Sequence, residues 1–352
     1  MESRTPYIPA PVRGTQLTEF VEGQTAAPRR EDVPSREKDR VRAPADPPRE
    51  RRRSNIGPYK LERRIEGGKA ECWLCTDTRD GSKKFLKKFP SPKMPSDDDR
   101  IRDRAAYENQ VRMCNEFLLH HQQVMRDIAG LRVGNGALVK PLDAFWHEAS
   151  FFKISPFVEG LQTFSAEVVR SWSTQRRTIA IRSVLLALRE LHDQGIAHGD
   201  IKLDNIHLVE TPSGPVARLI DFDDAYRADA PPLSTVLGGT EDYYSPEVLV
   251  YKGFAASPTP LPLGFASDLF SLSLALHEAF SKGGLKPHWG GRETSDAGMC
   301  AISGDTVDYQ PLGTGRPLLE YRLKLCLALE PRHRPRVTEL LSACGTNLGR
   351  IA

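Results

Sequence analysis

The stretch IAHGDIKLDN, residues 196–205, places two carboxylates, a lysine, a histidine and an amide within ten positions. It connects an apolar pattern of helical period to an apolar pattern typical of a strand. The next segment, IHLVETPSGPVARLI, indicates a hairpin turned at Ser213-Gly214, and the acidic stretch DFDD follows it. Such a hairpin would bring Asn205 and Asp221, which flank it, close together.

These side chains suit a divalent cation that is bound to phosphate. Asp200, Asn205 and Asp221 offer hard oxygen ligands, and Mg²⁺ favours one or two carboxylates together with phosphate oxygens and water. A nucleotide phosphate is therefore the natural remaining ligand.

A positive charge for that phosphate could come from the segment FLKKF, which is typical of a strand. Either Lys87 or Lys88 could supply it, and a glutamate on the following helix would be needed to orient the lysine. Glu108 fits this role.

Composition sets the class of protein. The 352 residues are 39% hydrophobic and 27% charged, which indicates one or two globular domains and a tail. No apolar run approaches the roughly 20 residues of a membrane span, and the first residues lack the apolar core of a secretory signal. The six cysteines are scattered, so we expect a reducing, cytoplasmic location and no membrane partner. The net charge of +3 is too small to indicate nucleic-acid binding.

The chain divides into three parts. Residues 1–56 are rich in Pro, Arg and acidic residues without a helical or strand period, and predict a disordered tail whose RERRRS cluster could dock a partner or be a solvated charge run. Residues 57–160 predict an antiparallel β lobe with one long helix over residues 99–125. Residues 161–352 predict a larger, mainly helical lobe, so the fold class is α+β with two lobes.

Five motifs in order resemble those of the eukaryotic-like serine/threonine protein kinases, over roughly residues 59–341. HGDIKLDN resembles the catalytic loop and DFD the metal-binding triplet. GGTEDYYSPE resembles the end of the activation segment, SDLFSLSL the central helix of the large lobe, and RHRPR a late arginine motif. The resemblance implies a bilobal protein-kinase-like fold, with ATP and Mg²⁺ as cofactors and protein serine or threonine hydroxyls as substrates.

The resemblance also implies roles for residues of the catalytic loop. Asp200 would be the catalytic base, and Lys202 would contact the transferring phosphate. Asn205 and Asp221 would hold the metal, and Asp221 would bridge it to the phosphates. Lys202, together with the Gly239-Thr240 pair, resembles the serine/threonine pattern rather than the tyrosine pattern.

The nucleotide would be bound mainly by the smaller lobe. The resemblance makes Lys87 the lysine that grips the α- and β-phosphates and pairs with Glu108. Adenine would face backbone groups in the connection between the lobes, and the glycine-rich turn would cover the phosphates. The remaining nucleotide-binding residues implied in this way are Ile65, Gly67, Gly68, Phe157 and Val158.

Other motif residues would be structural. Glu247 and Arg334 are expected to form a buried ion pair, and Asp268 to brace the catalytic loop from beneath. His198 is expected to pack and to brace the backbone.

The sequence departs from the family pattern in three places. Glu66 and Glu71 stand where the phosphate-covering loop would have glycines, which predicts weak ATP binding because negative side chains oppose phosphate. Gly199 stands where many kinases have an arginine that clamps a phosphorylated activation segment, so we expect activity without phosphorylation of that segment. Asp223 replaces a flexible glycine, and either preserves the turn or adds a carboxylate near the metal.

Two alternative functions stay open. HGD and LIDFDDAYRAD also resemble the aminoglycoside and choline phosphotransferases, although those enzymes usually have histidine in place of Lys202 and lack the GTEDYYSPE segment. The other alternative is a pseudokinase that acts as a binding or scaffold module, which the poor glycine loop favours and the intact catalytic residues oppose.

Overall fold

The computed structural model describes residues 55–66, 70–131, 136–234, 236–281, 297–304 and 309–345. Contacts divide the chain into residues 1–50 and 51–352, and all described residues belong to the second unit. The predicted tail therefore lies outside the described residues, except for Asn55–Ile56, which form strand β1. Among the described helices, none is both long and apolar enough to cross a membrane.

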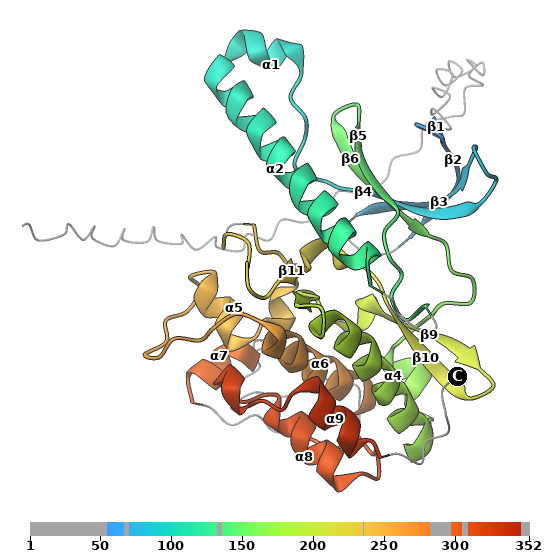
Figure 1. The fold of residues 1–352 in the computed structure, drawn as a ribbon, viewed down its shortest axis with the longest axis vertical. Coiled ribbons are helices and arrows are strands. Elements are labelled where there is room, and N and C mark those ends of the chain that lie inside the picture. The colour runs from blue at the N-terminus through green and yellow to red at the C-terminus, as the bar shows by residue number, and fades with distance from the viewer. Residues whose placement is uncertain are drawn as a thin grey trace, which may run out of the picture. The chain divides into compact units, whose positions relative to one another are not determined.

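The smaller lobe is an antiparallel sheet, as the sequence predicts (Figure 1). Asp80-Gly81 makes the turn of the β3–β4 hairpin, where Gly81 takes a positive φ of 73° and Asp80 accepts a hydrogen bond from the backbone of Ser82. The strand order is β1-β2-β3-β4-β6-β5, where β2 is Tyr59–Ile65, β3 Glu71–Asp77, β4 Lys83–Lys88, β5 Asp143–His147 and β6 Ser150–Pro156.

The long helical pattern forms two helices and not the single helix that the sequence predicts. Helix α1 spans Asp97–Arg102 and α2 spans Arg104–Ala129, and Asp103 between them is extended. Asp103 ends the first helix because its carboxylate caps the second, accepting a hydrogen bond from the backbone N–H of Ala106 at 3.0 Å.

Helix α2 packs its apolar side chains onto one face of the sheet. Phe117, Leu118 and Met125 of the helix contact a cluster that includes Phe89 and Phe151. His121 lies in the same cluster with its ring centroid 5.1 Å from that of Phe89, and it is only 1% exposed. Burial and the nearby Lys153 lower the pKa of His121 to about 3.

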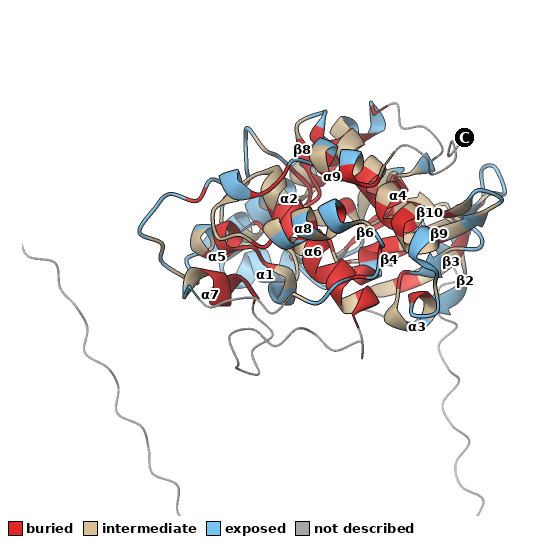
Figure 2. Cartoon of the chain, turned by 90° about the horizontal axis from the view of Figure 1, so that it is seen from below, coloured by how far each residue is buried: buried red, intermediate tan, exposed pale blue. Residues whose placement is uncertain are grey.

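The larger lobe is helical, with its core around two long helices. Helix α4 spans Thr174–His192 and α6 spans Phe265–Phe280, and most of α6 is buried (Figure 2). Around them lie α3 (Ala166–Val169), α5 (Pro246–Tyr251), α7 (Ala297–Ile302), α8 (Pro317–Leu325) and α9 (Val337–Ala343). The short strands are β7 (Gln162–Thr163), β8 (Ile196–Ala197), β9 (Ile206–Thr211), β10 (Gly214–Leu219) and β11 (Tyr226–Arg227).

The expected ion pair between Glu247 and Arg334 is confirmed, and both side chains are fully buried. The two guanidinium nitrogens Nη1 and Nη2 donate to the two carboxylate oxygens at 2.6 and 2.8 Å. The pair ties α5 to the segment that precedes α9. A buried pair of this kind leaves an uncompensated charge when one partner is removed.

We expect Arg334→Met to lower the free energy of unfolding by about 3–5 kcal/mol, because Glu247 would keep a buried charge without a partner. Urea unfolding followed by circular dichroism measures this. The control is Arg332→Ala two residues away, whose side chain is 77% exposed and should change the free energy of unfolding by less than about 1 kcal/mol. Equal effects of the two variants would contradict the prediction.

His121 should make the fold sensitive to acid. The folded state keeps the imidazole neutral to about pH 3, whereas in the unfolded chain it takes up a proton near its ordinary pKa of 6.5. The stability that depends on neutral His121 is complete above pH 6.5 and is lost as the pH falls below it, at about 1.4 kcal/mol per pH unit. We expect His121→Phe to reduce the slope of stability against pH by that amount between pH 6 and 5. An unchanged slope in His121→Phe would contradict the prediction.

Candidate active site

The hairpin predicted between the two acidic stretches is present and joins their ends. Strands β9 and β10 pair from Ile206 with Leu219 to Thr211 with Gly214, so the turn lies at Pro212-Ser213, one residue earlier than predicted. Beyond the last strand pair, the N–H of Ile220 donates to the carbonyl oxygen of Asn205 at 3.1 Å. The hairpin therefore brings the backbones of Asn205 and Asp221 together at its open end.

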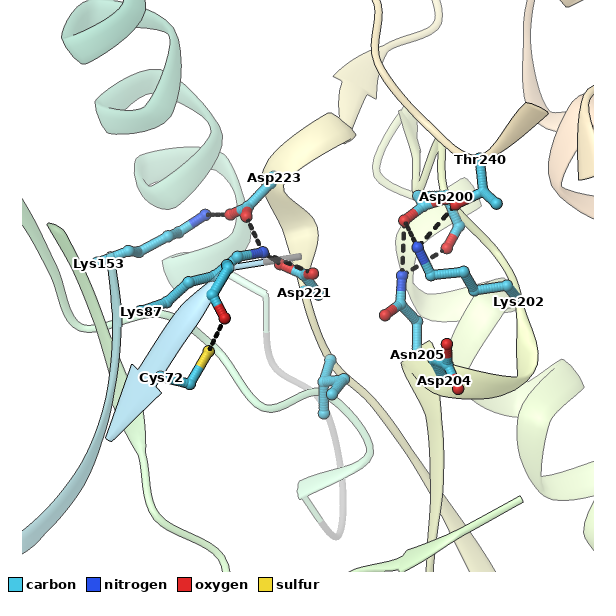
Figure 3. Close-up of polar contacts among 12 residues, drawn as sticks. Cys72, Lys87, Lys153, Asp200, Lys202, Asp204, Asn205, Asp221, Asp223 and Thr240 are labelled. Carbon is cyan, nitrogen blue, oxygen red and sulfur yellow. Dashed lines mark hydrogen bonds and ion pairs between the residues drawn. The ribbon is translucent and has the colours of Figure 1, made fainter. Parts of the chain in front are cut away.

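Asp200 is the centre of a closed hydrogen-bonded cluster (Figure 3). Its Oδ2 accepts from Lys202 Nζ at 2.6 Å and from Asn205 Nδ2 at 2.9 Å, and its Oδ1 accepts from Thr240 Oγ1 at 2.8 Å. Lys202 Nζ also donates to Thr240 Oγ1 at 2.7 Å. Each carboxylate oxygen is held in place, and the side chain is 6% exposed.

Asp268 of α6 braces the backbone beneath this cluster, as expected. Its carboxylate accepts from the backbone N–H groups of His198 and Gly199 at 2.8 and 3.0 Å, and lies 2.9 Å from His192 Nε2. Burial opposes the charge on Asp268, but the bond from His192 and the nearby histidines hold its pKa below the usual value. The His198 ring in turn contacts the carbonyl oxygen of Ile220 at 3.0 Å, which confirms its bracing role.

A second cluster contains Lys87 and the aspartates of the DFD triplet. Lys87 Nζ lies 2.8 Å from both carboxylate oxygens of Asp221 and 2.5 Å from Oδ2 of Asp223. Asp221 has φ 61° and ψ 68°, a left-handed conformation that aspartate tolerates better than most residues. Burial would lower the pKa of Lys87, but Asp223 and Asp221 raise it above its ordinary value, so the lysine stays charged.

The predicted pairing of Lys87 with Glu108 is wrong. Glu108 accepts from Arg104 Nε at 2.8 Å on the exposed first turns of α2, and its side chain is 61% exposed. The part of α2 near Lys87 is that around His121, since both residues lie against the ring of Phe89. Glu108 precedes His121 by 13 residues, which is about 20 Å along a helix. The sequence pattern could not reveal this because it does not specify which turn of a 26-residue helix meets the sheet.

The cross-strand register places several predicted nucleotide-binding residues on one face of the sheet. Ile65 lies opposite Cys72, and Cys72 lies opposite Lys87, and directly opposed residues of antiparallel strands share a face. Glu71 lies opposite Lys88 on the other face, and the two form an ion pair at 3.0 Å. The Glu71 carboxylate therefore points away from the face that carries Lys87.

The other nucleotide-binding predictions are placed only in part. Phe157 and Val158 directly follow β6, whose last residue Pro156 pairs with Lys84 of β4, and both are half-buried. Gly67 and Gly68 lie outside the described residues.

The sequence did not reveal three partners in these clusters. The motif that contains Thr240 indicates only the type of substrate, and no sequence pattern links Asp223 or Lys153 to Lys87. Lys153 Nζ lies 2.6 Å from Asp223 Oδ1, and its side chain is 5% exposed. A signal was present in β6, because Lys153 is the one charged residue in the run SFFKISP and alternation places it on the face of Phe151, which contacts α2.

The donors at the open end of the hairpin fit a cation that is bound to phosphate. Asn205 Nδ2 donates to the backbone carbonyl oxygen and to Oδ2 of Asp200, which leaves the side-chain carbonyl oxygen of Asn205 as the atom for a metal. Asp221 adds a carboxylate. Among the described residues no group of three or more His, Cys, Asp or Glu could hold a metal, but Mg²⁺ needs only one or two such ligands when phosphate supplies the rest.

Comparison with known proteins agrees with this geometry. The protein kinase domain family matches residues 66–343. The chain is 26% identical over 254 residues to a smooth-muscle myosin light chain kinase of Gallus gallus, a match that covers 71% of this chain and 11% of the relative.

Two other relatives are a probable serine/threonine-protein kinase of Plasmodium falciparum and a meiosis-specific serine/threonine-protein kinase of Saccharomyces cerevisiae. The first is 27% identical over 47% of this chain and 31% of its own length, and the second is 34% identical over 35% of this chain and 26% of its own length. The chain thus spans less than a third of the length of each of these relatives. Because the family match extends over most of the sequence and includes both clusters, this chain belongs to the protein kinase domain family.

Proposed function

We propose that this protein is a serine/threonine protein kinase that transfers the γ-phosphoryl group of ATP to protein hydroxyls. The observation that carries the proposal is the closed cluster of Asp200, Lys202, Asn205 and Thr240 at the end of a hairpin whose other end is Asp221, bound by Lys87. The named serine/threonine kinases among its relatives support the same choice of substrate.

Asp200 performs the proton chemistry in this proposal. Its carboxylate orients the acceptor hydroxyl and takes its proton as the new oxygen–phosphorus bond forms and the bond to the leaving ADP oxygen breaks. Lys202 lies 2.6 Å from the same carboxylate and offsets charge on the phosphoryl group as it moves. Thr240 fixes the relative positions of Asp200 and Lys202, because it contacts both.

Lys87, Asn205 and Asp221 bind and neutralise the nucleotide phosphates. Asn205 and Asp221 would hold Mg²⁺, which supplies positive charge to the phosphate oxygens when it is bound. Glu71 pairs with Lys88 and lies on the opposite face of the sheet from Lys87. Its negative charge therefore opposes phosphate binding less than the sequence predicts. The protein contributes position and charge, which is the main requirement for phosphoryl transfer.

Replacing Asp200 by asparagine tests the proposal. We expect Asp200→Asn to lower kcat for transfer of labelled phosphate from ATP to a generic protein substrate by at least about 100-fold, because the base is lost while the shape is kept. The thermal shift caused by ATP and Mg²⁺ should remain, since Asp200 is not the main phosphate ligand. The matched control is Asp204→Asn, an exposed acid in the same loop, which should retain full activity.

Two results would contradict the proposal. A wild-type protein that labels an aminoglycoside or choline but no protein would be a small-molecule phosphotransferase. A wild-type protein that shows neither labelling nor a thermal shift with ATP and Mg²⁺ would be a binding module.

We also propose that activity does not depend on phosphorylation of the segment after Asp224. Gly199 supports this: its φ is +78°, and a Cβ atom there would lie 2.2 Å from the carbonyl oxygen of Asp224. No side chain fits this position without a backbone shift, so no basic group can reach a phosphate from it.

The double variant Ser234→Ala/Thr235→Ala should keep kcat/KM within about twofold of the wild type, because position 199 has no basic side chain that could bind a phosphate. Thr235 lies outside the described residues, and the preceding residue Ser234 is half-buried. Steady-state kinetics on protein treated with a phosphatase and on untreated protein provide the comparison. A tenfold loss in the double variant, or after phosphatase treatment, would contradict independence from phosphorylation.

A further inference from the structure

Two lysines lie side by side in the site, and their positive charges repel each other. The register of β4 and β6 places Lys87 directly opposite Lys153, where Cβ atoms of antiparallel partners are about 5 Å apart. The Lys153 side chain is 5% exposed and that of Lys87 is 20% exposed. Two like charges this close and this buried need carboxylates beside them.

Helix α2 does not supply those carboxylates. Glu108 pairs with Arg104, Glu116 is exposed, and Asp127 accepts from Gln123 near the other end of the helix. At the turn of α2 that packs on Phe89 the helix presents His121, which is neutral.

Asp223 supplies the missing charge. Its Oδ2 lies 2.5 Å from Lys87 Nζ and its Oδ1 lies 2.6 Å from Lys153 Nζ, so one carboxylate bridges both lysines (Figure 3). Asp223 belongs to the 3₁₀ turn Phe222–Asp224, which contacts α2, and its side chain is 12% exposed. Together with Asp221, the cluster balances two positive charges with two negative charges.

We propose that Asp223 is the positioning residue that holds Lys87 toward the nucleotide phosphates, anchored by Lys153, in place of a carboxylate from helix α2. The proposal rests on the proposed function of the site. When Asp221 binds a cation, Asp223 still offsets the charge of Lys87, because Lys153 holds the other carboxylate oxygen of Asp223. The segment that carries Asp221 and Asp223 then positions Lys87, and helix α2 contributes no charged partner to it.

The first experiment compares two charge-removing variants. We expect Asp223→Asn to weaken binding of a fluorescent ATP analogue at least tenfold and to raise KM for ATP by a similar factor, because Lys87 then has no carboxylate partner when Asp221 binds the cation. Glu108→Gln is the matched control for the helix carboxylate and should leave both values within twofold of the wild type. A role of Asp223 in folding alone would lower the melting temperature and leave KM for ATP unchanged.

A second variant tests the anchor and applies also if Asp223→Asn does not fold. Lys153→Met removes the anchor and one buried charge, and should raise KM for ATP several-fold through the freed Asp223. The double variant Asp223→Asn/Lys153→Met should bind ATP no more weakly than Asp223→Asn alone, because Lys153 acts only through Asp223.

The proposal would be overturned if Asp223→Asn and Lys153→Met both kept wild-type affinity for the ATP analogue, or if Glu108→Gln lost as much affinity as Asp223→Asn. Binding and turnover separate this proposal from the proposed function. Wild-type protein that binds the analogue but transfers no phosphate would refute the kinase proposal, while the binding comparison would still decide the role of Asp223. Wild-type protein that does not bind the analogue would refute both.

Discussion

The charges of Lys87 and Lys153 have to be neutralised within the protein, and this requirement links the sheet to the segment that follows the hairpin. Isolated charges are costly to bury, so both ammonium groups are stable there only beside Asp221 and Asp223. Burial opposes ionisation of Asp223, but Lys153 and Lys87 keep its pKa well below the usual value. Burial and the neighbouring Asp223 act in the other direction on Asp221 and raise its pKa. The triplet therefore contains one carboxylate whose negative charge is stabilised by two lysines and one whose negative charge is less stabilised by its surroundings.

The Asp200 cluster is held together by hydrogen bonds. Asp200 is surrounded by donors from its own loop and from Thr240, and the backbone below is bonded to Asp268 on the buried helix α6. Hydrogen bonds to a carboxylate in a dry environment are stronger than those at the surface, so the loop has little freedom to move. A candidate base that is held in this way is prepared for an incoming hydroxyl group. The Lys87 cluster, in contrast, is held by ion pairs between elements far apart in sequence.

The departures from the family pattern have local physical explanations. Gly199 is required because the carbonyl oxygen of Asp224 occupies the place of a side chain. Glu71 is neutralised by Lys88 on the other face of the sheet. Asp223 does not take a positive φ, so its backbone conformation does not require glycine. Its carboxylate bridges Lys87 and Lys153.

The sequence alone determined the lobes, the hairpin and the Asp200 loop, because these depend on local period, turn residues and closely spaced polar motifs. The Glu247–Arg334 pair joins residues 87 apart, and it was expected only from the resemblance to the protein kinases. The motif SDLFSLSL lies within helix α6, as the resemblance implied for the central helix of the large lobe. Only the tertiary structure decided which carboxylate meets Lys87. That partner depends on the strand register that sets Lys153 beside Lys87, and on the turn of α2 that reaches the sheet. Both are long-range packing choices, and residue spacing along one chain carries no direct record of them.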